Sequence, residues 1–190
     1  MAQPSFPCFA WQCDSPLQAK SLLSQFLELR PDSQWVLIGD GCVQSNLQLW
    51  TAWNCASLRW IRSSALARSL DAEFLRYLCG THHVSEAFKR AGVRDGDVRG
   101  FLLYLPSASN SDELQMDCSP VFFDESHIEE QAFSMLDELG LKRNPNLLSL
   151  SEEGAKRLGL NIENSQERLT EDTLIGHITV SYTHLTLPTN

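Results

Sequence analysis

The chain has 190 residues and a mass of 21.4 kDa, which is enough for one domain with a substantial core. Its net charge is −9, and no apolar run approaches the roughly 20 residues that a transmembrane helix needs. The N-terminal stretch lacks the basic segment and continuous apolar core of a signal peptide, so we expect a cytoplasmic protein.

Helices and short strands are expected along the whole chain, with no repeat and no domain break. Apolar spacing predicts strands over residues 6–13, 35–38 and 98–105, and helices over residues 16–30, 45–58, 70–78, 84–91, 126–139, 152–158 and 166–178. Weaker patterns indicate an exposed connection at 59–69, a surface loop at 107–119, a strand at 121–123 and an extended segment at 147–150. This order predicts a single α+β domain, a small mixed β-sheet packed with several helices.

Local residues also predict where several helices begin and end. The segment 14–16, Asp-Ser-Pro, is typical of a helix N-terminus, and Ser126 is expected to cap a later helix. Gly80 and Gly140 are placed to end helices in the left-handed conformation.

No catalytic or metal-binding motif is found in the chain. The six cysteines are scattered without a C-x-x-C pair, so we expect reduced, structural thiols and no metal or cofactor. Phosphate-binding loops, G-x-S-x-G and H-E-x-x-H are missing from the sequence. We therefore expect a protein that is not an enzyme.

One enzymatic alternative stays open at this point. Cys79, His82 and His83 lie close in sequence and could serve a small cytosolic enzyme if they met a carboxylate in a cleft. An open basic surface at this place would instead favour an interaction protein.

The charge is unevenly distributed. Residues 59–104 contain eight basic and five acidic side chains, a balance of +3, whereas the remainder carries seven basic and nineteen acidic ones, a balance of −12. Such asymmetry can focus a local positive field on an acidic protein. Solvated helix faces are the plainer interpretation of the same residues.

The last residues are interpreted as foreign to the native protein. Residues 180–190 resemble a translated library adapter, so we expect the domain to cover residues 1–179 and the true C-terminus to be lost. No function is assigned to Tyr182 or His184 for this reason.

Five features in a fixed order resemble the accessory, kinase-binding subunit of the KEOPS (EKC) complex, the TPRKB-like family. The central one covers residues 73–93, in which Val-Ser-Glu-Ala-Phe-Lys-Arg-Ala-Gly-Val at 84–93 is similar to the family signature. The strand at 35–40, the helix at 47–58, the Arg- and Ser-bearing connection and the segment 151–160 accompany it. The resemblance extends over residues 34–178.

The resemblance implies a non-catalytic subunit that binds the KEOPS kinase/ATPase and helps recruit tRNA through its 3′ CCA end. The modification it would serve is threonylcarbamoyl-adenosine next to the anticodon. The residues expected to contact tRNA are Arg59, Arg62, Arg68, His82, His83, Lys89 and Arg90. Those expected to contact the kinase are Leu169, Leu174, Ile175 and Ile178. His82 and His83 depart from the Arg or Gln usual in the family, so a phosphate contact there would be weaker or replaced by stacking on a base.

Overall fold

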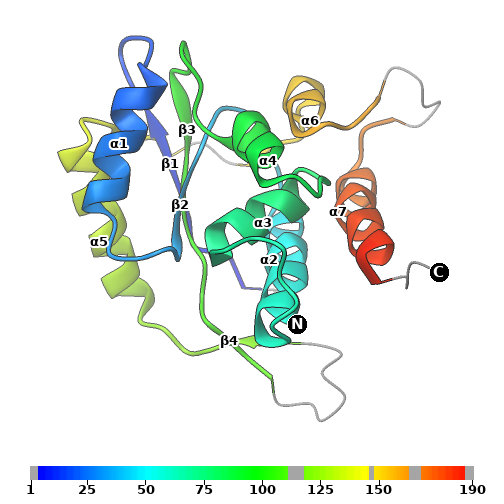
Figure 1. Cartoon of the computed structure of the whole chain (residues 1–190). Coiled ribbons are helices and arrows are strands. Elements are labelled where there is room, and N and C mark those ends of the chain that lie inside the picture. Colours follow the sequence, from blue (N-terminus) through cyan, green and yellow to red (C-terminus); the bar gives the residue numbers. More distant parts are fainter. Residues whose placement is uncertain (1–3, 111–117, 146–147, 163–167, 187–190) are drawn as a thin grey trace.

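A four-stranded sheet with helices on both faces forms the molecule (Figure 1). The computed structural model describes residues 4–110, 118–145, 148–162 and 168–186, and the side chains of the last helix up to residue 180. The predicted α+β class is confirmed. Among the described residues, no helix combines the length and apolarity that crossing a bilayer requires.

The sheet has the strand order β2-β3-β1-β6, with β1 at Cys8–Gln12, β2 at Trp35–Ile38, β3 at Arg99–Tyr104 and β6 at Lys142–Arg143. Every pairing in it is antiparallel, so the expected mixture of strand directions is wrong. The physical reason is the long helical connection after β2, which returns the chain to the end of the sheet that it had left. Ile38 at the end of β2 therefore lies opposite Phe101 near the start of β3.

Two apolar layers cover the two faces of the sheet. On one face Trp35, Leu37 and Leu102 pack against α1 (Ala19–Leu29) and α5 (Glu125–Glu138). Val36 and Ile38 point to the other face, which the remaining helices cover. Because alternate residues of β2 enter different cores, this strand is apolar at every position.

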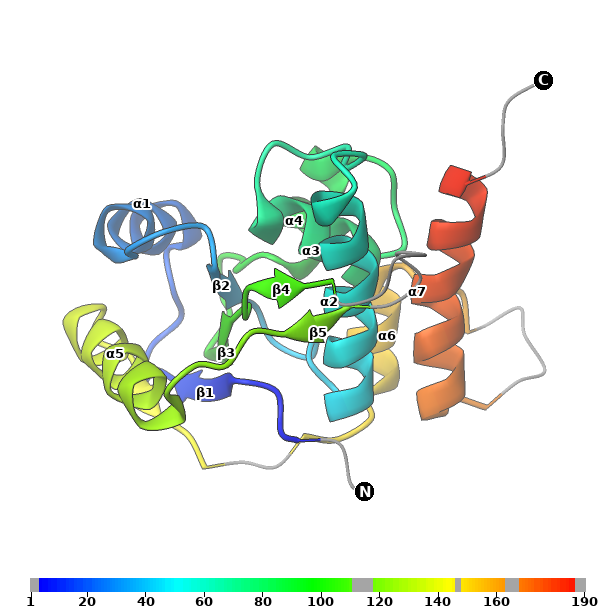
Figure 2. The ribbon, with the colours of Figure 1, turned by 90° about the horizontal axis from the view of Figure 1, so that it is seen from below.

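The second layer, called the helical layer below, contains five helices: α2 (Asn46–Ile61), α3 (Leu70–Leu78), α4 (Val84–Ala91), α6 (Glu152–Leu158) and α7 (Glu171–Thr186). A capping box at Ser45 and Gln48 begins α2. Gly80 and Gly140 adopt the left-handed conformation that the sequence predicts, with φ of 58° and 70°. Figure 2 shows α7 on the outer side of α2, away from the sheet.

The N-termini of two helices differ from the prediction. Helix α1 begins at Ala19, not at Pro16, because the preceding segment is bonded to residues 95–98. The amide of Leu17 donates to the Asp97 carbonyl at 3.2 Å, and the amide of Ala19 donates to Asp95 Oδ1 at 2.8 Å. Asp124, not Ser126, caps α5, since its Oδ1 accepts from the amides of residues 126 and 127.

Several other boundaries also shift. Helix α2 continues to Ile61, so Arg59 is helical and not part of the connection. The prediction of a strand at 121–123 is wrong. The paired residues come just before this segment: β5 (Ser119–Pro120) pairs with β4 (Ala108–Ser109). Helix α7 begins at Glu171, and the predicted start at 166 lies outside the described residues. Residues 148–150 form no strand, while residue 147 also lies outside the described residues.

Helix α6 packs directly on the turn that follows β2. A Cβ atom added at Gly154 would collide with the carbonyl of Gly41. The buried amide of Gln44 joins the same two segments: its Nε2 donates to the Ser151 carbonyl at 3.0 Å and its Oε1 accepts from the Ser151 amide at 2.9 Å. The α6 backbone is therefore fixed against the end of the sheet.

We expect Gly154→Ala to lower the free energy of unfolding by about 1–3 kcal/mol, because the added methyl group forces α6 away from the turn. Gly176→Ala is the matched control, since a Cβ there meets nothing within 4 Å and Ala favours the helix by up to ~1 kcal/mol. Urea denaturation of both variants measures the difference. Equal stabilities would show that α6 does not depend on this close approach.

Candidate functional site

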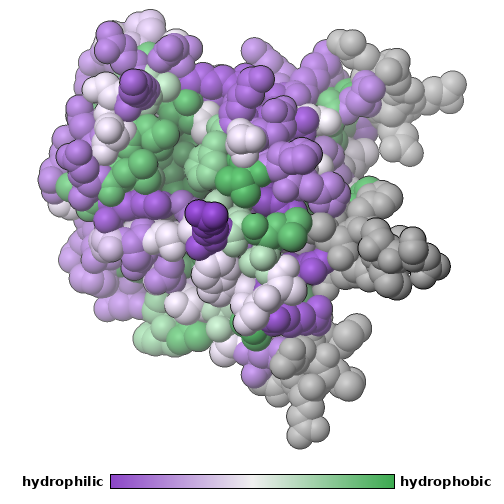
Figure 3. All heavy atoms as spheres, viewed as in Figure 1, coloured by the Kyte–Doolittle hydropathy of each residue, from purple (hydrophilic) through white to green (hydrophobic). Residues whose placement is uncertain are grey.

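The residues predicted to contact tRNA divide into exposed and internally bonded side chains. Arg68, His82, His83 and Lys89 are exposed, and Arg62 is half-buried. Arg68 belongs to the connector (residues 62–69) between α2 and α3, and the histidines belong to the turn (residues 79–83) between α3 and α4. Figure 3 shows that the visible face of the molecule mixes hydrophilic and smaller apolar areas.

Two of the predicted side chains are occupied inside the protein. Arg90 donates from Nε to Glu86 at 3.0 Å and from Nη1 to the carbonyl of Cys79 at 3.2 Å. Arg59 is half-buried and lies near Tyr77. Burial raises the pKa of Tyr77 to about 12, and the nearby Arg59 opposes that rise. The contacts of Arg90 thus join α4 to the end of α3.

A buried ion pair, which sequence reasoning missed, lies beneath the two loops. Glu73 and Arg76 approach to 2.8 Å on α3, with side chains 0% and 1% exposed. Glu73 Oε2 accepts from two connector amides, and Arg76 Nε donates to the carbonyl of His82 in the turn. The available signal was the i,i+3 spacing of opposite charges on a helix whose other residues, apart from Asp71, are apolar or aromatic.

The four residues predicted to contact the kinase are not equally accessible. Leu174 and Ile178 are each 1% exposed, whereas Leu169 and Ile175 are half-buried. Helix α7 packs on α2 and α3, so its apolar stripe covers the protein's own core. Ile175 and Leu169 are the members of this set that have side-chain surface left for a partner.

His177, a residue that the sequence did not single out, joins α7 to its neighbours. Its Nε2 lies 3.2 Å from the carbonyl of Leu158 at the end of α6. A Cβ on Gly80 would come within 2.6 Å of its ring. Burial lowers the pKa of His177, the charge of Arg90 lowers it further, and hydrogen bonds to the carbonyls of Leu158 and Cys79 oppose the shift.

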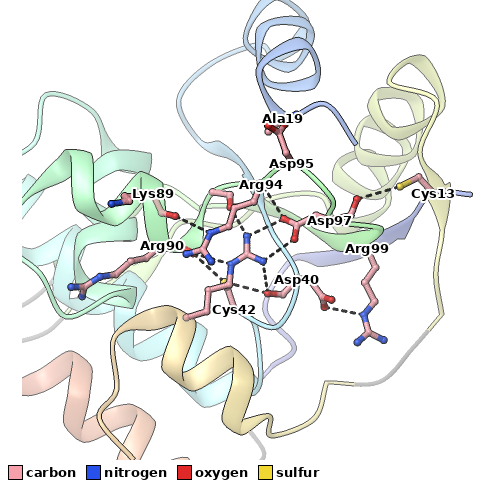
Figure 4. A network of polar contacts seen from close by, with 12 residues as sticks. Cys13, Ala19, Asp40, Cys42, Lys89, Arg90, Arg94, Asp95, Asp97 and Arg99 are labelled. Carbon is pink, nitrogen blue, oxygen red and sulfur yellow. Dashed lines mark hydrogen bonds and ion pairs between the residues drawn. The ribbon is translucent and has the colours of Figure 1, made fainter. Parts of the chain in front are cut away.

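A polar cleft of about 840 Å³ lies at the end of the sheet, and Arg157 is one of the residues that line it. Figure 4 shows the polar contacts of Asp40, Asp97 and Arg99 in this region. Arg157 is bidentate with Asp97, at 2.9 Å for both contacts. Its remaining donors reach the carbonyls of Asp40, Arg90 and Gly92 at 3.1, 3.0 and 2.7 Å. Burial disfavours the charged form, but the hydrogen bond and charge of Asp97 prevail and raise the pKa of Arg157.

The charges in this cleft are largely engaged with each other. Arg99 pairs with Asp40 at 2.9 Å, and Asp97 also accepts from the amide of Arg94 at 2.8 Å. Such a set stabilises the junction of helices and sheet but presents no nucleophile beside a base. Among the described residues, no group of three His, Cys, Asp or Glu side chains could hold a metal ion.

Cys79, His82 and His83 do not come together in a cleft, as the enzymatic alternative requires. Cys79 is fully buried and its Sγ donates to the carbonyl of Ala87 at 3.6 Å, whereas His82 and His83 face solvent. Burial raises the pKa of the Cys79 thiol, which disfavours the reactive thiolate. The geometry therefore gives this alternative no support.

Comparison with known protein families finds a match over most of the chain. The family described as kinase binding protein CGI-121 matches residues 17–178, which is more than half of the chain. No curated protein matches the chain. The matched range contains both loops, the buried ion pair, the residues predicted to contact the kinase and every residue that lines the cleft except Ala10 and Trp11.

We expect Arg157→Met to lower the free energy of unfolding by about 3–5 kcal/mol, because Asp97, whose side chain is 10% exposed, would lose its charged partner and keep only the amide of Arg94. Arg99→Met, which breaks an exposed pair in the same cleft, should cost at most about 1 kcal/mol. Guanidinium denaturation distinguishes the two. Similar losses in both variants would contradict the structural role of Arg157.

The lowered pKa of His177 predicts a pH-dependent stability. The folded protein binds fewer protons at this site than the unfolded chain, so stability is full above about pH 6.5 and is lost as the pH falls through the folded pKa. His177→Gln should reduce the slope of unfolding free energy against pH in this range by up to about 1.4 kcal/mol per pH unit. Urea denaturation at several pH values tests this, and an unchanged slope would contradict it.

Proposed function

Because the chain belongs to the kinase binding protein CGI-121 family, we propose that it is a non-catalytic subunit of KEOPS. In this role it binds the kinase/ATPase subunit and helps recruit tRNA, through the 3′ CCA end, for threonylcarbamoyl-adenosine modification. The family match over residues 17–178 is the observation that carries the proposal. We further propose a cytoplasmic location, and a native domain of residues 1–179 with a foreign tail at 180–190.

A kinase partner follows from the family, and its place on α7 is our proposal. Ile175 and Leu169 keep side-chain surface for contact, while Leu174 and Ile178 fix the helix on the core beneath them. A partly exposed apolar side chain that becomes buried on binding can contribute about 1.5–3 kcal/mol. We assign the direct contacts to the half-buried pair and a supporting role to the buried pair.

For tRNA, we propose the surface formed by the connector, the turn and the exposed side of α4. Arg68 and Lys89 supply exposed positive charge there, although the whole chain carries −9. His82 and His83 are exposed beside them and can stack on unpaired bases. Arg59, Arg62 and Arg90 are half-buried, and Arg90 is bonded to Glu86 and to the carbonyl of Cys79.

The proposal that the subunit is non-catalytic rests on how the reactive groups are placed. Cys79 is buried, Arg99 and Arg157 of the cleft are paired with Asp40 and Asp97, and the family is described as kinase-binding. Chemistry on tRNA would then belong to other subunits of the complex.

Ile175→Glu should weaken binding of the KEOPS kinase at least ten-fold while the domain stays folded, because the residue is half-buried. Leu174→Ala is the contrasting variant: it should lower the unfolding free energy by about 2–5 kcal/mol and act on binding only through stability. Calorimetric titration with the purified kinase, alongside urea denaturation, separates the two effects. Full kinase binding by folded Ile175→Glu would place the interface elsewhere.

Charge reversal at Arg68 and Lys89 should weaken tRNA binding and reduce the slope of log K against log salt by roughly 0.7–0.9 for each phosphate that the protein no longer neutralises. Lys142→Glu is the matched control, because this lysine is exposed on β6, outside the proposed surface. Filter binding over a range of salt concentrations measures both quantities. A tRNA that lacks its CCA end should bind less tightly to the wild type, and unchanged binding there would contradict the proposed role of that end.

A further inference from the structure

We propose that the Glu73–Arg76 ion pair is a positioning device that holds the connector and the turn together as one RNA-binding surface. The inference rests on the proposed function for its ligand, and on the contacts of the two side chains for everything else. Neither residue touches solvent, so neither can contact RNA itself. Their effect on binding has to pass through the loops that they hold.

Glu73 holds the connector by its backbone. Oε2 accepts hydrogen bonds from the amides of Leu66 at 3.1 Å and Ala67 at 2.9 Å. Ala67 is thereby drawn into the protein, while the neighbouring Leu66 and Arg68 stay exposed. The exposed position of Arg68 is thus set by a carboxylate that lies beneath it.

Arg76 holds the turn at two points. Its Nε donates to the carbonyl of His82 at 3.0 Å, and its own carbonyl accepts from the amide of Thr81 at 3.0 Å. The hydroxyl of Thr81 then accepts from the amide of His83 at 3.2 Å. The backbone of both histidines is consequently held in place by hydrogen bonds.

The contact between the two side chains closes the chain of interactions. The carboxylate of Glu73 bonds the connector with one oxygen and meets Arg76 Nη1 with the other, at 2.8 Å. Connector, Glu73, Arg76 and turn thus form one continuous series of polar contacts. Loops that are separate in sequence are held at a fixed spacing across one turn of α3.

Stability alone does not account for a pair placed in this way. The free energy needed to desolvate two charges offsets much of the free energy gained from their attraction. Apolar side chains of similar volume therefore often stabilise a core equally well. What apolar residues cannot supply is directional bonding to the backbone of loops that have no strand or helix of their own. An RNA chain that meets both loops would bind more tightly because they are ordered beforehand.

A second buried pair on the same helix offers a matched control. Asp71 pairs with Arg30 at 2.7 Å, and the side chains of the two residues are 6% and 17% exposed. Arg30 also donates to the carbonyl of Trp35, so this pair joins α1 and β2 to α3 and bonds neither loop. Removing either pair takes one positive and one negative charge from contact with α3, and Arg30 is the more exposed of the two arginines.

The test compares the full-length double variants Glu73→Met/Arg76→Met and Arg30→Met/Asp71→Leu. We expect the first to bind tRNA roughly ten-fold more weakly than the wild type, and the second to stay within about two-fold. Hydrogen exchange at the amides of Leu66, Ala67 and His83 should accelerate in the first variant alone. Denaturant unfolding of both variants gives the stability against which these changes are judged.

Three results would overturn the proposal: equal losses of tRNA affinity in both double variants, unchanged affinity in the first, or unchanged exchange at the loop amides. Should the first variant not fold, Arg76→Lys keeps the charge but cannot reach both Glu73 and the His82 carbonyl. It should accelerate exchange at His83 and weaken tRNA binding, while Leu66 and Ala67 stay protected; full affinity would again refute the role. If the wild type binds no tRNA, the proposal that this protein recruits tRNA is wrong, and the RNA-binding role of the ion pair is wrong with it. The exchange data would still show whether the pair orders the loops.

Discussion

The guanidinium of Arg157 is the contact on which the helical layer depends. It meets the carboxylate of Asp97 with two parallel hydrogen bonds and satisfies three backbone carbonyls from two other segments. Two of these carbonyls, those of Arg90 and Gly92, lie at the C-terminal end of α4, where helix geometry leaves acceptors without partners. Arg157 of α6 therefore satisfies the carbonyls at the C-terminal end of α4. It also joins α4 to the segment before β3 and to the turn after β2.

The placement of the proposed binding surfaces follows from this junction. With α6 fixed, the carbonyl of Leu158 is presented to His177, and that histidine in turn contacts Gly80 at the beginning of the turn. The proposed kinase helix and one of the proposed RNA-binding loops thus touch each other inside the molecule. A partner that shifts α7 would act on the turn through this contact, because packed interfaces of this kind move as units.

Some basic residues of this protein bond groups of their own chain, and others are exposed to solvent. The sequence does not distinguish the two kinds, because both carry the same charge. Arg76, Arg90 and Arg157 bond carboxylates and backbone carbonyls of their own chain. Arg68 and Lys89 remain exposed on the surface. Setting aside the pairs Arg76–Glu73 and Arg90–Glu86 leaves the balance over residues 59–104 at +3, because each pair removes one charge of either sign. The positive charge that a polyanion would meet therefore lies on fewer side chains, among them Arg68 and Lys89, and depends on where these are placed.

The sequence by itself determined the strands at 35–38 and 98–105, most helices, and the left-handed residues Gly80 and Gly140, because periodicity, capping and turn chemistry act within a few residues. It also carried the order of features that marks the kinase-binding family. Only the tertiary structure decided the strand directions, the start of α1, the burial of Leu174 and Ile178, and which arginines are internal. These depend on contacts between distant segments: the partners of Arg157 are 60 to 117 residues away along the chain, beyond the reach of any local pattern.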